Sequence, residues 1–432
     1  MTHNQQHQRP QVVVLGGGFA GLSAVRALRK APVDVTVVDR NAYNTFQPLL
    51  YQVATAGLNP GDITYFLRSV HAGQANMRFS KGAVSSLDPA ARTVLLDSGT
   101  ELRFDYLVIA TGMTTNFFGV PGAEEHALAL YTRDQALAVR DRMFTGLEGA
   151  VRRGQPDDLR TVVVGGGATG VEMAGTLAEL RNSGLSTLYP ELDIERTHIT
   201  LVEMAPQLLS PFSERSQTYT ADALRRRGVQ LRLNTTVKEV RPDGVIVNDG
   251  ELIPAGLVVW ASGIKAPDDV AEWGVPQDAS GRIEVGPDMR VRGFDHVFAA
   301  GDIALNPDAL PQLAQPALQG GRHAGEQIAR LVADEQTEPF HYSDKGIMAT
   351  IGRSAAVAEI THLPTITGFP AWAIWIGIHV ISLLGYRNRV ATVVNLASRY
   401  LSWPRTFNAI VGDVRTPREQ SEPDRRTSGH TS

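Results

Sequence analysis

The chain has 432 residues, 43% of them hydrophobic and 20% charged, a length and balance that predict two or three globular domains and exclude a largely disordered chain. The net charge of −4 gives no electrostatic reason to expect nucleic acid as a partner. The sequence contains no cysteine, which excludes disulfides, thiolate metal sites and every reaction that needs a redox-active thiol.

The first predicted elements are a strand and a glycine-rich loop. The N-terminal MTHNQQHQRP is polar, so we expect no secretory signal and a cytoplasmic start. An apolar run at residues 12–15 leads into the G-x-G-x-x-G pattern of Gly16, Gly18 and Gly21, followed by a helical segment. Such glycines permit a tight turn, the approach of a diphosphate, and packing of helix on strand. The next strand ends at Asp39, where an acid can bind a ribose. This combination predicts a dinucleotide site, rather than glycines that serve packing alone.

A second loop repeats the first in the middle of the chain. Gly165, Gly167 and Gly170 follow an apolar run and precede a helical segment. The next strand ends at Glu203, after a spacing longer than the usual one of about 20 residues, which fits an insertion around residues 182–196. A carboxylate there repels a 2′-phosphate, so we expect NADH rather than NADPH. The alternative is that Glu203 is only an exposed acid at the end of a strand.

Three further buried strands end in turns with small or acidic residues. The turns are Thr111 and Gly112 after YLVIATG, Ser262 and Gly263 after LVVWASG, and Gly301 and Asp302 in HVFAAGDIA. An aspartate just past a strand end can accept hydrogen bonds from the ribityl and diphosphate end of FAD. One enzyme rarely needs two nicotinamides, so we expect a flavin at one of the two loops.

Together, these loops and turns resemble the two-dinucleotide-binding flavoprotein reductases over residues 10–330. The resemblance implies an α/β fold with two nested Rossmann-like domains. The FAD-binding domain is expected at residues 10–125 and 285–345, and the NADH-binding domain at residues 126–284 between them. Nicotinamide and flavin would meet at the domain junction, so that hydride can pass to flavin N5.

The missing cysteines narrow the choice of electron acceptor. The absence of cysteine excludes the enzymes that pass electrons through a thiol, which are glutathione, lipoamide and thioredoxin reductases, NADH peroxidases and sulfide:quinone reductases. The electron acceptors that remain are a quinone, a small iron–sulfur protein or oxygen. A quinone is favoured by the apolar, aromatic stretch at residues 44–63. It is also favoured by Gln315 and Gln319, which share a helix face at i, i+4. Pro316 suits a first helical turn, so the helix would start at Gln315 with its positive end towards a reduced flavin.

The segments FQPLLYQVA, GGGATGVEMAG, AAGDIA, AQPALQGG and KGIMATIGR, in this order, resemble the type II NADH dehydrogenases, also called alternative NADH:quinone oxidoreductases. The resemblance implies that NADH reduces a membrane quinone, menaquinone or ubiquinone, through FAD. With a single flavin and no multi-span segment, we expect no proton pumping. The one visible departure is Ala168, where we would expect proline, and it leaves the glycines intact.

The resemblance also implies roles for single residues. Gln315 and Gln319 would line the quinone pocket, Glu172 would contact the nicotinamide, and Lys345, at the entrance of a strand pair predicted within residues 341–360, would lie near flavin or quinone. The simpler alternatives are amides that satisfy local polar groups, a dipole partner at a helix start, and a solvated charge. The expected cofactor contacts are Gly16, Gly18, Gly21, Asp39, Arg40, Gln47, Leu49, Thr111, Gly112, Gly301, Asp302, Ala314, Gln315, Gly165, Gly167, Gly170, Glu203, Ser262 and Gly263. No histidine has metal-ligand spacing, so no metal is expected.

The C-terminal region, residues 346–410, is predicted to associate with a membrane. Residues 369–386 form an apolar stretch near the lower limit for spanning a bilayer. The next segment is amphipathic, with one apolar face, flanking arginines, and aromatic residues that suit the headgroup layer. The apolar face is Val390, Val393, Val394, Ala397 and Leu401; the arginines are Arg387, Arg389, Arg399 and Arg405; the aromatics are Trp372, Trp375, Tyr386, Tyr400 and Trp403.

This pattern is typical of a protein that lies on a membrane. We therefore expect peripheral or monotopic attachment to the cytoplasmic face of the cell membrane, with quinone entering beneath Gln315 and Gln319. A buried helix pair, a dimer interface and a single span are the alternatives, and the choice between monomer and homodimer stays open. Residues 411–432 are polar and expected to be disordered.

Other functions also stay open. A cytosolic FAD-dependent NADH:ferredoxin or rubredoxin reductase would be free of cysteine too, but it should lack the apolar tail and the paired glutamines. A non-catalytic membrane-bound NADH sensor would keep both loops and show no turnover. Quinone-linked flavin chemistry with another donor is disfavoured by Glu203.

Overall fold

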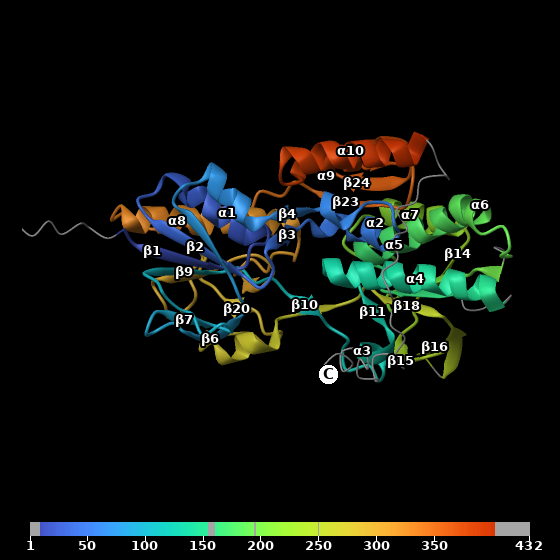
Figure 1. Cartoon of the computed structure of the whole chain (residues 1–432), viewed down its shortest axis with the longest axis horizontal. Coiled ribbons are helices and arrows are strands. Elements are labelled where there is room, and N and C mark those ends of the chain that lie inside the picture. Colours follow the sequence, from blue (N-terminus) through green and yellow to red (C-terminus); the bar gives the residue numbers. More distant parts are fainter. Residues whose placement is uncertain (1–8, 154–159, 194–195, 249, 402–432) are drawn as a thin grey trace, which may run out of the picture.

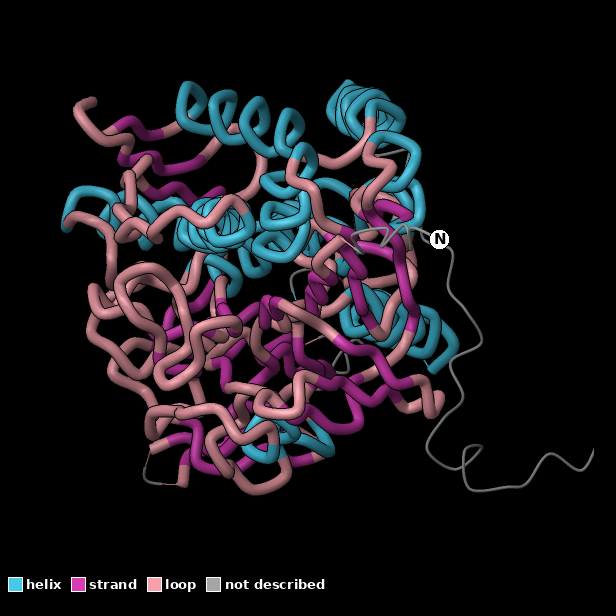
Figure 2. The backbone as a smooth tube through the Cα atoms, turned by 90° about the vertical axis from the view of Figure 1, so that its left-hand side faces the viewer, coloured by secondary structure: helices cyan, strands magenta, loops and turns pink. Residues whose placement is uncertain are grey.

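The computed structural model describes residues 9–153, 160–193, 196–248 and 250–401. Two α/β halves lie side by side, and the C-terminal strands and helices form a layer across the top (Figure 1). Seen end-on, most of the helices lie in the upper part of the molecule and most of the strands lie in the lower part (Figure 2). The predicted tail at residues 411–432 lies outside the described residues, as do Trp403 and Arg405.

The first half is built on a five-stranded parallel sheet with the order β21-β9-β1-β2-β5. The strands are β1 (Gln11–Leu15), β2 (Asp34–Asp39), β5 (Met77–Lys81), β9 (Tyr106–Ile109) and β21 (Val297–Ala299). Helices α1 (Phe19–Ala27) and α8 (Ala314–Val332) cover one face, and the antiparallel sheet β6-β7-β8 covers the other (Figure 1). Both faces are therefore buried, which is why the strands are continuous apolar runs.

The second half repeats this plan with the order β11-β18-β12-β13-β14, again all parallel. The strands are β11 (Leu128–Ala129), β12 (Thr161–Val164), β13 (Ile199–Val202), β14 (Val229–Arg232) and β18 (Leu257–Trp260). Its helices are α4 (Arg133–Arg153), α5 (Ala168–Glu179) and α7 (Glu214–Arg226), and its antiparallel sheet is β15-β16-β17. In each half the strand before the glycine loop is the central one, so the predicted fold of two nested Rossmann-like units is confirmed.

Two short strands join the halves where the chain crosses between them. Strand β10 (Thr114–Thr115) leads into the second half, β19 (Ile264–Lys265) leads back, and the two pair antiparallel. The remaining short strands are β3 (Tyr43–Thr45), β4 (Thr64–Phe66), β6 (Val84–Asp88), β7 (Thr93–Leu96), β8 (Glu101–Arg103), β15 (Val237–Arg241), β16 (Gly244–Val247), β17 (Glu251–Pro254), β20 (Ile283–Glu284) and β22 (Ala304–Leu305). The short helices are α2 (Leu50–Ala54), α3 (Ala123–His126) and α6 (Ser186–Leu188).

The C-terminal layer is a three-stranded antiparallel sheet with two helices. Strands β23 (Ile347–Thr350) and β24 (Ala356–Glu359) confirm the predicted pair, and β25 (Ile366–Thr367) adds an edge. Helices α9 (Phe369–Ser382) and α10 (Tyr386–Leu401) follow. Among the described residues, none of the helices has both the length and the apolar character needed to cross a bilayer.

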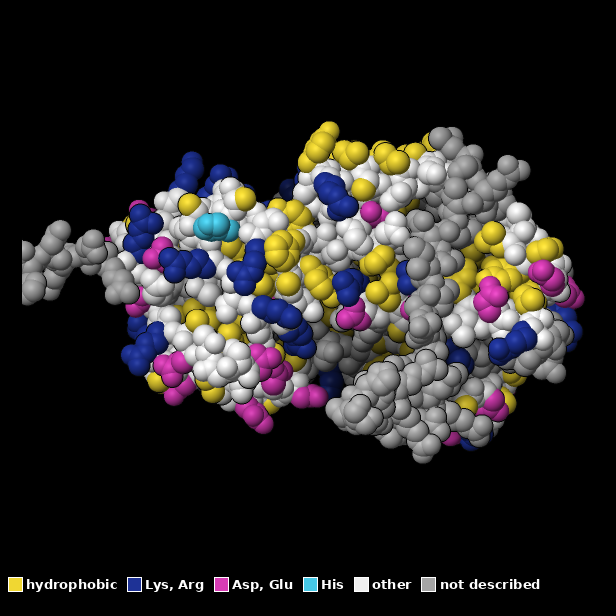
Figure 3. Space-filling model, in the orientation of Figure 1, with side chains coloured by type: hydrophobic (Ala, Val, Ile, Leu, Met, Phe, Trp, Pro, Cys, Tyr) yellow, Lys and Arg dark blue, Asp and Glu magenta, His cyan; other side chains and the backbone are white. Residues whose placement is uncertain are grey.

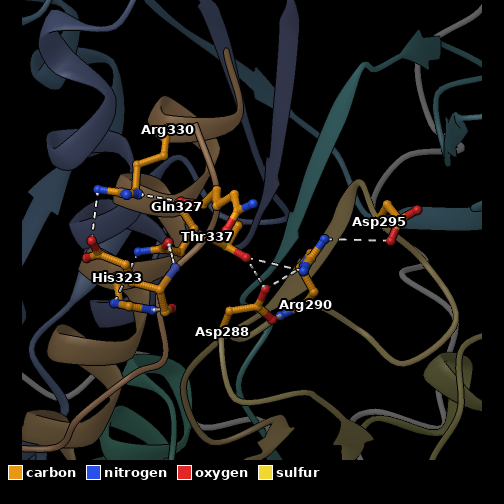
Figure 4. A network of polar contacts seen from close by, with 9 residues as sticks. Asp288, Arg290, Asp295, His323, Gln327, Arg330 and Thr337 are labelled. Atoms are coloured by element: carbon orange, nitrogen blue, oxygen red, sulfur yellow. Dashed lines mark hydrogen bonds and ion pairs between the residues drawn. The ribbon is translucent and has the colours of Figure 1, made fainter. Parts of the chain in front are cut away.

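A polar network holds the far end of α8 to the chain that follows it (Figure 4). Asp288 accepts hydrogen bonds from Arg290 Nε at 2.6 Å and from Thr337 Oγ1 at 2.7 Å. Gln327 of α8 accepts one from the main-chain N–H of Glu338 at 2.7 Å. The segment that leads from α8 to β23 is thus bound along its first residues.

Candidate active site

In the first glycine loop, the outer two glycines of the pattern are packed against other atoms, whereas the middle one has free space beside it. Gly16 has φ +104°, and a Cβ there would lie 2.3 Å from Ala110 O. A Cβ on Gly21 would lie 1.9 Å from Gly16 O, so strand and helix touch through backbone alone. At Gly18 a Cβ would meet no atom within 4 Å. The open position lies at the start of α1, where free N–H groups can bind a diphosphate.

The second loop has the same geometry. Gly165 has φ +111°, and a Cβ on Gly170 would lie 1.8 Å from Gly165 O. At Gly167, just before α5, a Cβ would again meet nothing within 4 Å. Both loops therefore leave room at one middle glycine next to a helix N-terminus, as a dinucleotide requires.

The acid after each loop also holds that loop in place. Asp39 accepts hydrogen bonds from Gly17 N and Asn41 N, each at 2.7 Å. Glu203 accepts one from Gly166 N and another from Ala205 N at 2.7 Å. A carboxylate has about four lone-pair sites, so each acid can still accept from a ribose hydroxyl. Arg40, beside Asp39, is exposed.

The turns after β9 and β21 meet beside the first loop. Thr111 Oγ1 is buried and has no hydrogen-bond partner within the part of the chain that the structure describes. Gly301 has φ +81°, and a Cβ there would lie 3.0 Å from the Cβ of Ala20 in α1. Burial raises the pKa of Asp302 to about 6, and the charge of Arg282 opposes this rise. A buried hydroxyl without a partner beside an open loop fits a bound cofactor that supplies the missing hydrogen bond.

The corresponding turn after β18 lies against the second loop. A Cβ on Gly165 would lie 3.0 Å from the Cβ of Ser262. Gly263 has φ +69°, and a Cβ there would lie 2.2 Å from the ring of Phe118. The pattern matches the first half, where Gly16 lies against Thr111, with one difference: an aromatic ring covers Gly263.

Helix α8 brings the two predicted glutamines to the same edge of the site. It starts at Ala314, one residue before the predicted start, and lies against α1. Gln319 Nε2 donates to Ser343 O at 2.9 Å, and its Oε1 accepts from Ser343 N at 3.0 Å. The same Nε2 lies 3.5 Å from Gln315 Oε1. Gln319 thus binds the main chain before β23, whereas Gln315 Nε2 has no partner in the described residues.

Three other predicted residues differ in their surroundings. The side chain of Lys345 is exposed and makes no hydrogen bond or ion pair within the described ranges. Gln47 Nε2 donates to Tyr131 O at 3.3 Å, and Leu49, two residues later, is buried. The structure therefore brings Gln47 and Leu49 to the junction between the halves and leaves Lys345 at the surface.

Tyr131 is a junction residue that the sequence did not reveal. It comes from the second half, just before α4, and its hydroxyl accepts from Met113 N of the first half at 3.4 Å. Burial raises its pKa, and the charge of Asp302 adds to this rise. A tyrosine before a helix start has no signal in the sequence that would point across to another domain.

Glu172 is the buried carboxyl of the site. It lies on α5, is 8% exposed, and accepts a hydrogen bond from Thr350 N of β23 at 3.3 Å. Burial raises its pKa to about 8, while the hydrogen bonds from Thr350 and from the Trp375 side chain oppose the rise. The expected headgroup position is wrong for Trp375, because α9 turns this residue towards α5 and leaves it 3% exposed.

The opposite faces of α9 and α10 are apolar and exposed. On α10 the polar residues point inwards: Asn395 Nδ2 donates to Asp62 Oδ2 at 2.6 Å, and Asn388 Nδ2 donates to Thr64 O. The predicted apolar face points outwards, and its yellow side chains line the upper edge of Figure 3. The exposed fractions are 60% for Phe369, 69% for Ile381, 82% for Tyr386, 43% for Val390, 50% for Val393 and 57% for Val394. The side chains of Arg399, Tyr400 and Leu401 lie outside the described set.

Comparison with known proteins places these features in a wider context. Residues 10–321 match the family model described as pyridine nucleotide-disulphide oxidoreductase. Two curated relatives from Mycobacterium tuberculosis, Type II NADH:quinone oxidoreductase Ndh and NdhA, are 35% and 36% identical over 93% and 94% of this chain and 89% and 90% of their own. A Staphylococcus aureus Type II NADH:quinone oxidoreductase is 31% identical over 82% of this chain and 91% of its own.

A solved structure shares the fold. The structure titled as NDH2 from Plasmodium falciparum in complex with NADH has a TM-score of 0.85, with 19% identity, and covers 93% of this chain and 100% of its own. The disulphide in the description of the family model has no counterpart in this chain, since it contains no cysteine.

Proposed function

The chain belongs to the type II NADH:quinone oxidoreductases, enzymes that oxidise NADH with a quinone as acceptor, and on this premise we propose that its electrons pass through a bound FAD without proton pumping. The observation that carries the FAD proposal is the open Gly18 beside the unpartnered hydroxyl of Thr111. When bound, FAD accepts hydride from NADH and passes two electrons to the quinone. Acidification of sealed vesicles by the pure protein and NADH would contradict the absence of pumping.

The chain's own residues would hold FAD in the first half. The N-terminus of α1 at Gly18 would bind the diphosphate, and Asp39 would accept from a ribose hydroxyl. The hydroxyl of Thr111 would donate a hydrogen bond to FAD, and Asp302 would lie at the ribityl end of FAD. This assignment gives an FAD-binding domain of residues 10–125 and 285–345.

The second half would hold NADH, in a domain of residues 126–284. The N-terminus of α5 at Gly167 would bind the diphosphate, and Glu203 would accept from the adenosine ribose. Met204, next to Glu203, is 73% exposed and carries no charge to attract a 2′-phosphate. The site therefore favours NADH over NADPH.

Glu172 would hold a proton at the junction. Oxidation of one NADH by one quinone consumes one proton, so a carboxyl that stays protonated at neutral pH in a water-poor place suits the reaction. With its pKa raised to about 8, Glu172 is such a group. Its place on α5, four residues after Ala168 where the helix begins, is also consistent with a contact to the nicotinamide.

Gln315 is the residue we expect to bind the quinone carbonyl. Its Nε2 is the amide donor of the pair without a protein partner in the described residues, whereas Gln319 holds Ser343. In Gln315→Ala, NADH should bleach the flavin at the wild-type rate under anaerobic conditions. Reoxidation by a soluble quinone analogue should slow about 10-fold, which is the loss of roughly one hydrogen bond. Stopped-flow absorbance measures both steps separately.

Two variants control this experiment. Gln336→Ala removes an exposed amide beyond the end of α8 and should leave both rates unchanged. Gln319→Ala should loosen the segment before β23. It should therefore slow reoxidation indirectly, and, unlike Gln315→Ala, it should also make the flavin easier to release. Equal reoxidation by wild type and Gln315→Ala would remove Gln315 from the quinone site.

The exposed apolar face of α9 and α10 would rest on the bilayer, on the cytoplasmic side, as the membrane-associating region of residues 346–410. Replacing both Val393 and Val394 by Asp should weaken binding to liposomes at least about 10-fold, because two apolar contacts are lost and two charges must stay hydrated. Turnover with a soluble quinone should stay within about two-fold of wild type. Liposome co-sedimentation measures the binding.

The matched control replaces Leu95 and Leu252 by Asp. These leucines are 37% and 38% exposed and lie in the outer antiparallel sheets of the two halves. Liposome binding should not change in this variant. If the Val393 and Val394 replacement instead splits a homodimer in gel filtration and leaves liposome binding intact, the face is a subunit interface.

A further inference from the structure

One aromatic residue beside the second glycine loop is unusual in both its backbone conformation and its exposure. Phe118, in the segment that leads from β10 into the second half, has φ +53°. A residue as bulky as phenylalanine rarely adopts this left-handed conformation. Phe118 is also 62% exposed. The chain thus uses a strained backbone to hold a large apolar ring in water, an arrangement typical of functional sites.

Three hydrogen bonds of Asn116 fix this segment against the end of β18. Asn116 Oδ1 accepts from Phe118 N at 2.7 Å, which closes a turn around the aromatic residue. Asn116 N donates to Gly263 O at 3.1 Å, and Trp260 Nε1 donates to Asn116 O at 2.9 Å. The surrounding structure therefore imposes the left-handed conformation of Phe118.

The ring of Phe118 lies on the turn that flanks the second loop. A Cβ on Gly263 would lie 2.2 Å from an atom of this ring, so the ring rests directly on the glycine. The residue before Gly263 is Ser262, whose Cβ would lie 3.0 Å from a Cβ on Gly165 of the loop. The ring is therefore at the edge of the space assigned to NADH.

The order of strands indicates which end of NADH would reach this ring. A dinucleotide lies across the carboxyl ends of the strands of such a sheet. The diphosphate is assigned to Gly167, after the central β12, and the adenosine ribose to Glu203, after β13 on one side of it. Strand β18 pairs with β12 on the other side, so the turn at Gly263 faces the half of the coenzyme that carries the nicotinamide. The β10–β19 pair at the junction with the flavin half begins at the next residue, Ile264.

We propose that Phe118 is a further NADH-binding residue, whose ring packs against the nicotinamide riboside of the bound coenzyme. This inference rests on the proposed function, which assigns NADH to the second half. The exposed side of the ring supplies the contact, and the left-handed backbone supplies its position. An aromatic ring suits this ligand, because packing on a flat ring adds affinity without a charge or a directed hydrogen bond.

Phe118→Gly in the full, flavin-loaded chain tests this inference. It removes the ring and also relieves the backbone, since glycine adopts positive φ without strain. The midpoint of thermal unfolding should therefore equal that of the wild type or rise. The Kd for NADH, taken from the dependence of the anaerobic bleaching rate on NADH concentration, should rise about 10-fold, as expected for the loss of one stacked ring. Phe118→Tyr keeps the ring and should keep wild-type affinity.

Several results would overturn the proposal. An unchanged Kd in Phe118→Gly would show that the ring does not touch NADH, and a lower Kd would show that it obstructs the site. A fall in both unfolding midpoint and affinity would identify Phe118 as a structural residue. A 10-fold loss in Phe118→Tyr as well would show that the aromatic ring is not what binds.

ADP-ribose locates the contact along the coenzyme, because it has the adenosine and the diphosphate of NADH and lacks the nicotinamide. Its inhibition constant against NADH should be the same in Phe118→Gly and in the wild type. A 10-fold rise would place the ring at the other end and overturn the proposal. Phe66→Ala is the matched control, since Phe66 is 52% exposed and lies in β4 of the first half. It should leave both constants unchanged, and a rise in its Kd for NADH as large as that of Phe118→Gly would also overturn the proposal.

Gly167→Val separates this inference from the proposed function, because it fills the space assigned to the NADH diphosphate. If Gly167→Val and Phe118→Gly both raise the Kd for NADH, both stand. If only Gly167→Val raises it, the second half still binds NADH, and the inference about Phe118 fails alone. If neither variant raises it, NADH is assigned to the wrong half, and the inference fails with the proposed function.

Discussion

Gly18→Val should give a folded chain that has lost its flavin. Gly18 has φ −79° and ψ −163°, a conformation that valine adopts without strain. A Cβ there meets no protein atom within 4 Å, so the loop and α1 can keep their positions. The valine methyl groups would instead fill the space assigned to the FAD diphosphate. We expect flavin affinity to fall at least about 1000-fold, or about 4 kcal/mol, and NADH:quinone turnover to disappear with it.

The measurement is flavin absorbance per protein after gel filtration, alongside thermal unfolding. Gly73→Val is the matched control, because Gly73 lies in the same half and a Cβ there also meets nothing within 4 Å. It should remain yellow and active. A yellow Gly18→Val variant with wild-type turnover would remove the diphosphate from this loop.

Gly167→Val should have the complementary effect and lose NADH while keeping flavin. Gly167 has φ −72° and ψ −177°, and a Cβ there is equally free of protein contacts. Valine would fill the space assigned to the NADH diphosphate at the start of α5. We expect the Kd for NADH to rise at least about 100-fold, or about 2.8 kcal/mol. Anaerobic titration of flavin bleaching by NADH measures this Kd.

Dithionite provides the control for this variant, since it reduces flavin without a binding site. Gly167→Val should bleach normally with dithionite and require far more NADH than the wild type. The two glycine variants also test each other. If Gly167→Val lost the flavin and Gly18→Val kept it, the two dinucleotides would be assigned to the wrong halves.

The parts of the fold that follow from local pattern were predictable. Strand, glycine loop and helix are contiguous, so Gly16, Gly18 and Gly21 carry their own structural context, and so do their counterparts in the second half. The pairing of β1 with β2 follows in the same way, because α1 is a crossover helix between two parallel strands. The pairing of β23 with β24 was also visible as two apolar runs around a turn.

The side chains that meet across the junction were not predictable. Helix α9 is apolar on all sides, so no periodicity says that Trp375 and His379 face inwards. Tyr131 reaches Met113 across the junction where β10 and β19 join the halves. Gln319 pairs with Ser343 because the chain returns past α8 on its way to β23. Each of these contacts joins residues from two different elements. The sequence of one element does not indicate which other element will lie against it.

The inverted polarity of α10 was only half predictable. The apolar face with Val393 and Val394 was predicted to point towards a membrane rather than into a core, and it does point outwards. The sequence did not reveal what holds the polar face inwards, which is the hydrogen bond from Asn395 to Asp62, a carboxylate that is 8% exposed.

This inverted polarity limits how α10 can respond to a change of surroundings. A helix on a membrane can commonly release its apolar face by rolling about its long axis. Here rolling would break the hydrogen bonds of Asn388 and Asn395 and leave the buried Asp62 without the Asn395 donor, although it keeps the hydrogen bond from Asn59 N. The helix therefore cannot turn its other face outwards and keep these hydrogen bonds. If α10 rests on a lipid surface, as proposed, its release would leave the apolar face exposed to water or unfold the helix.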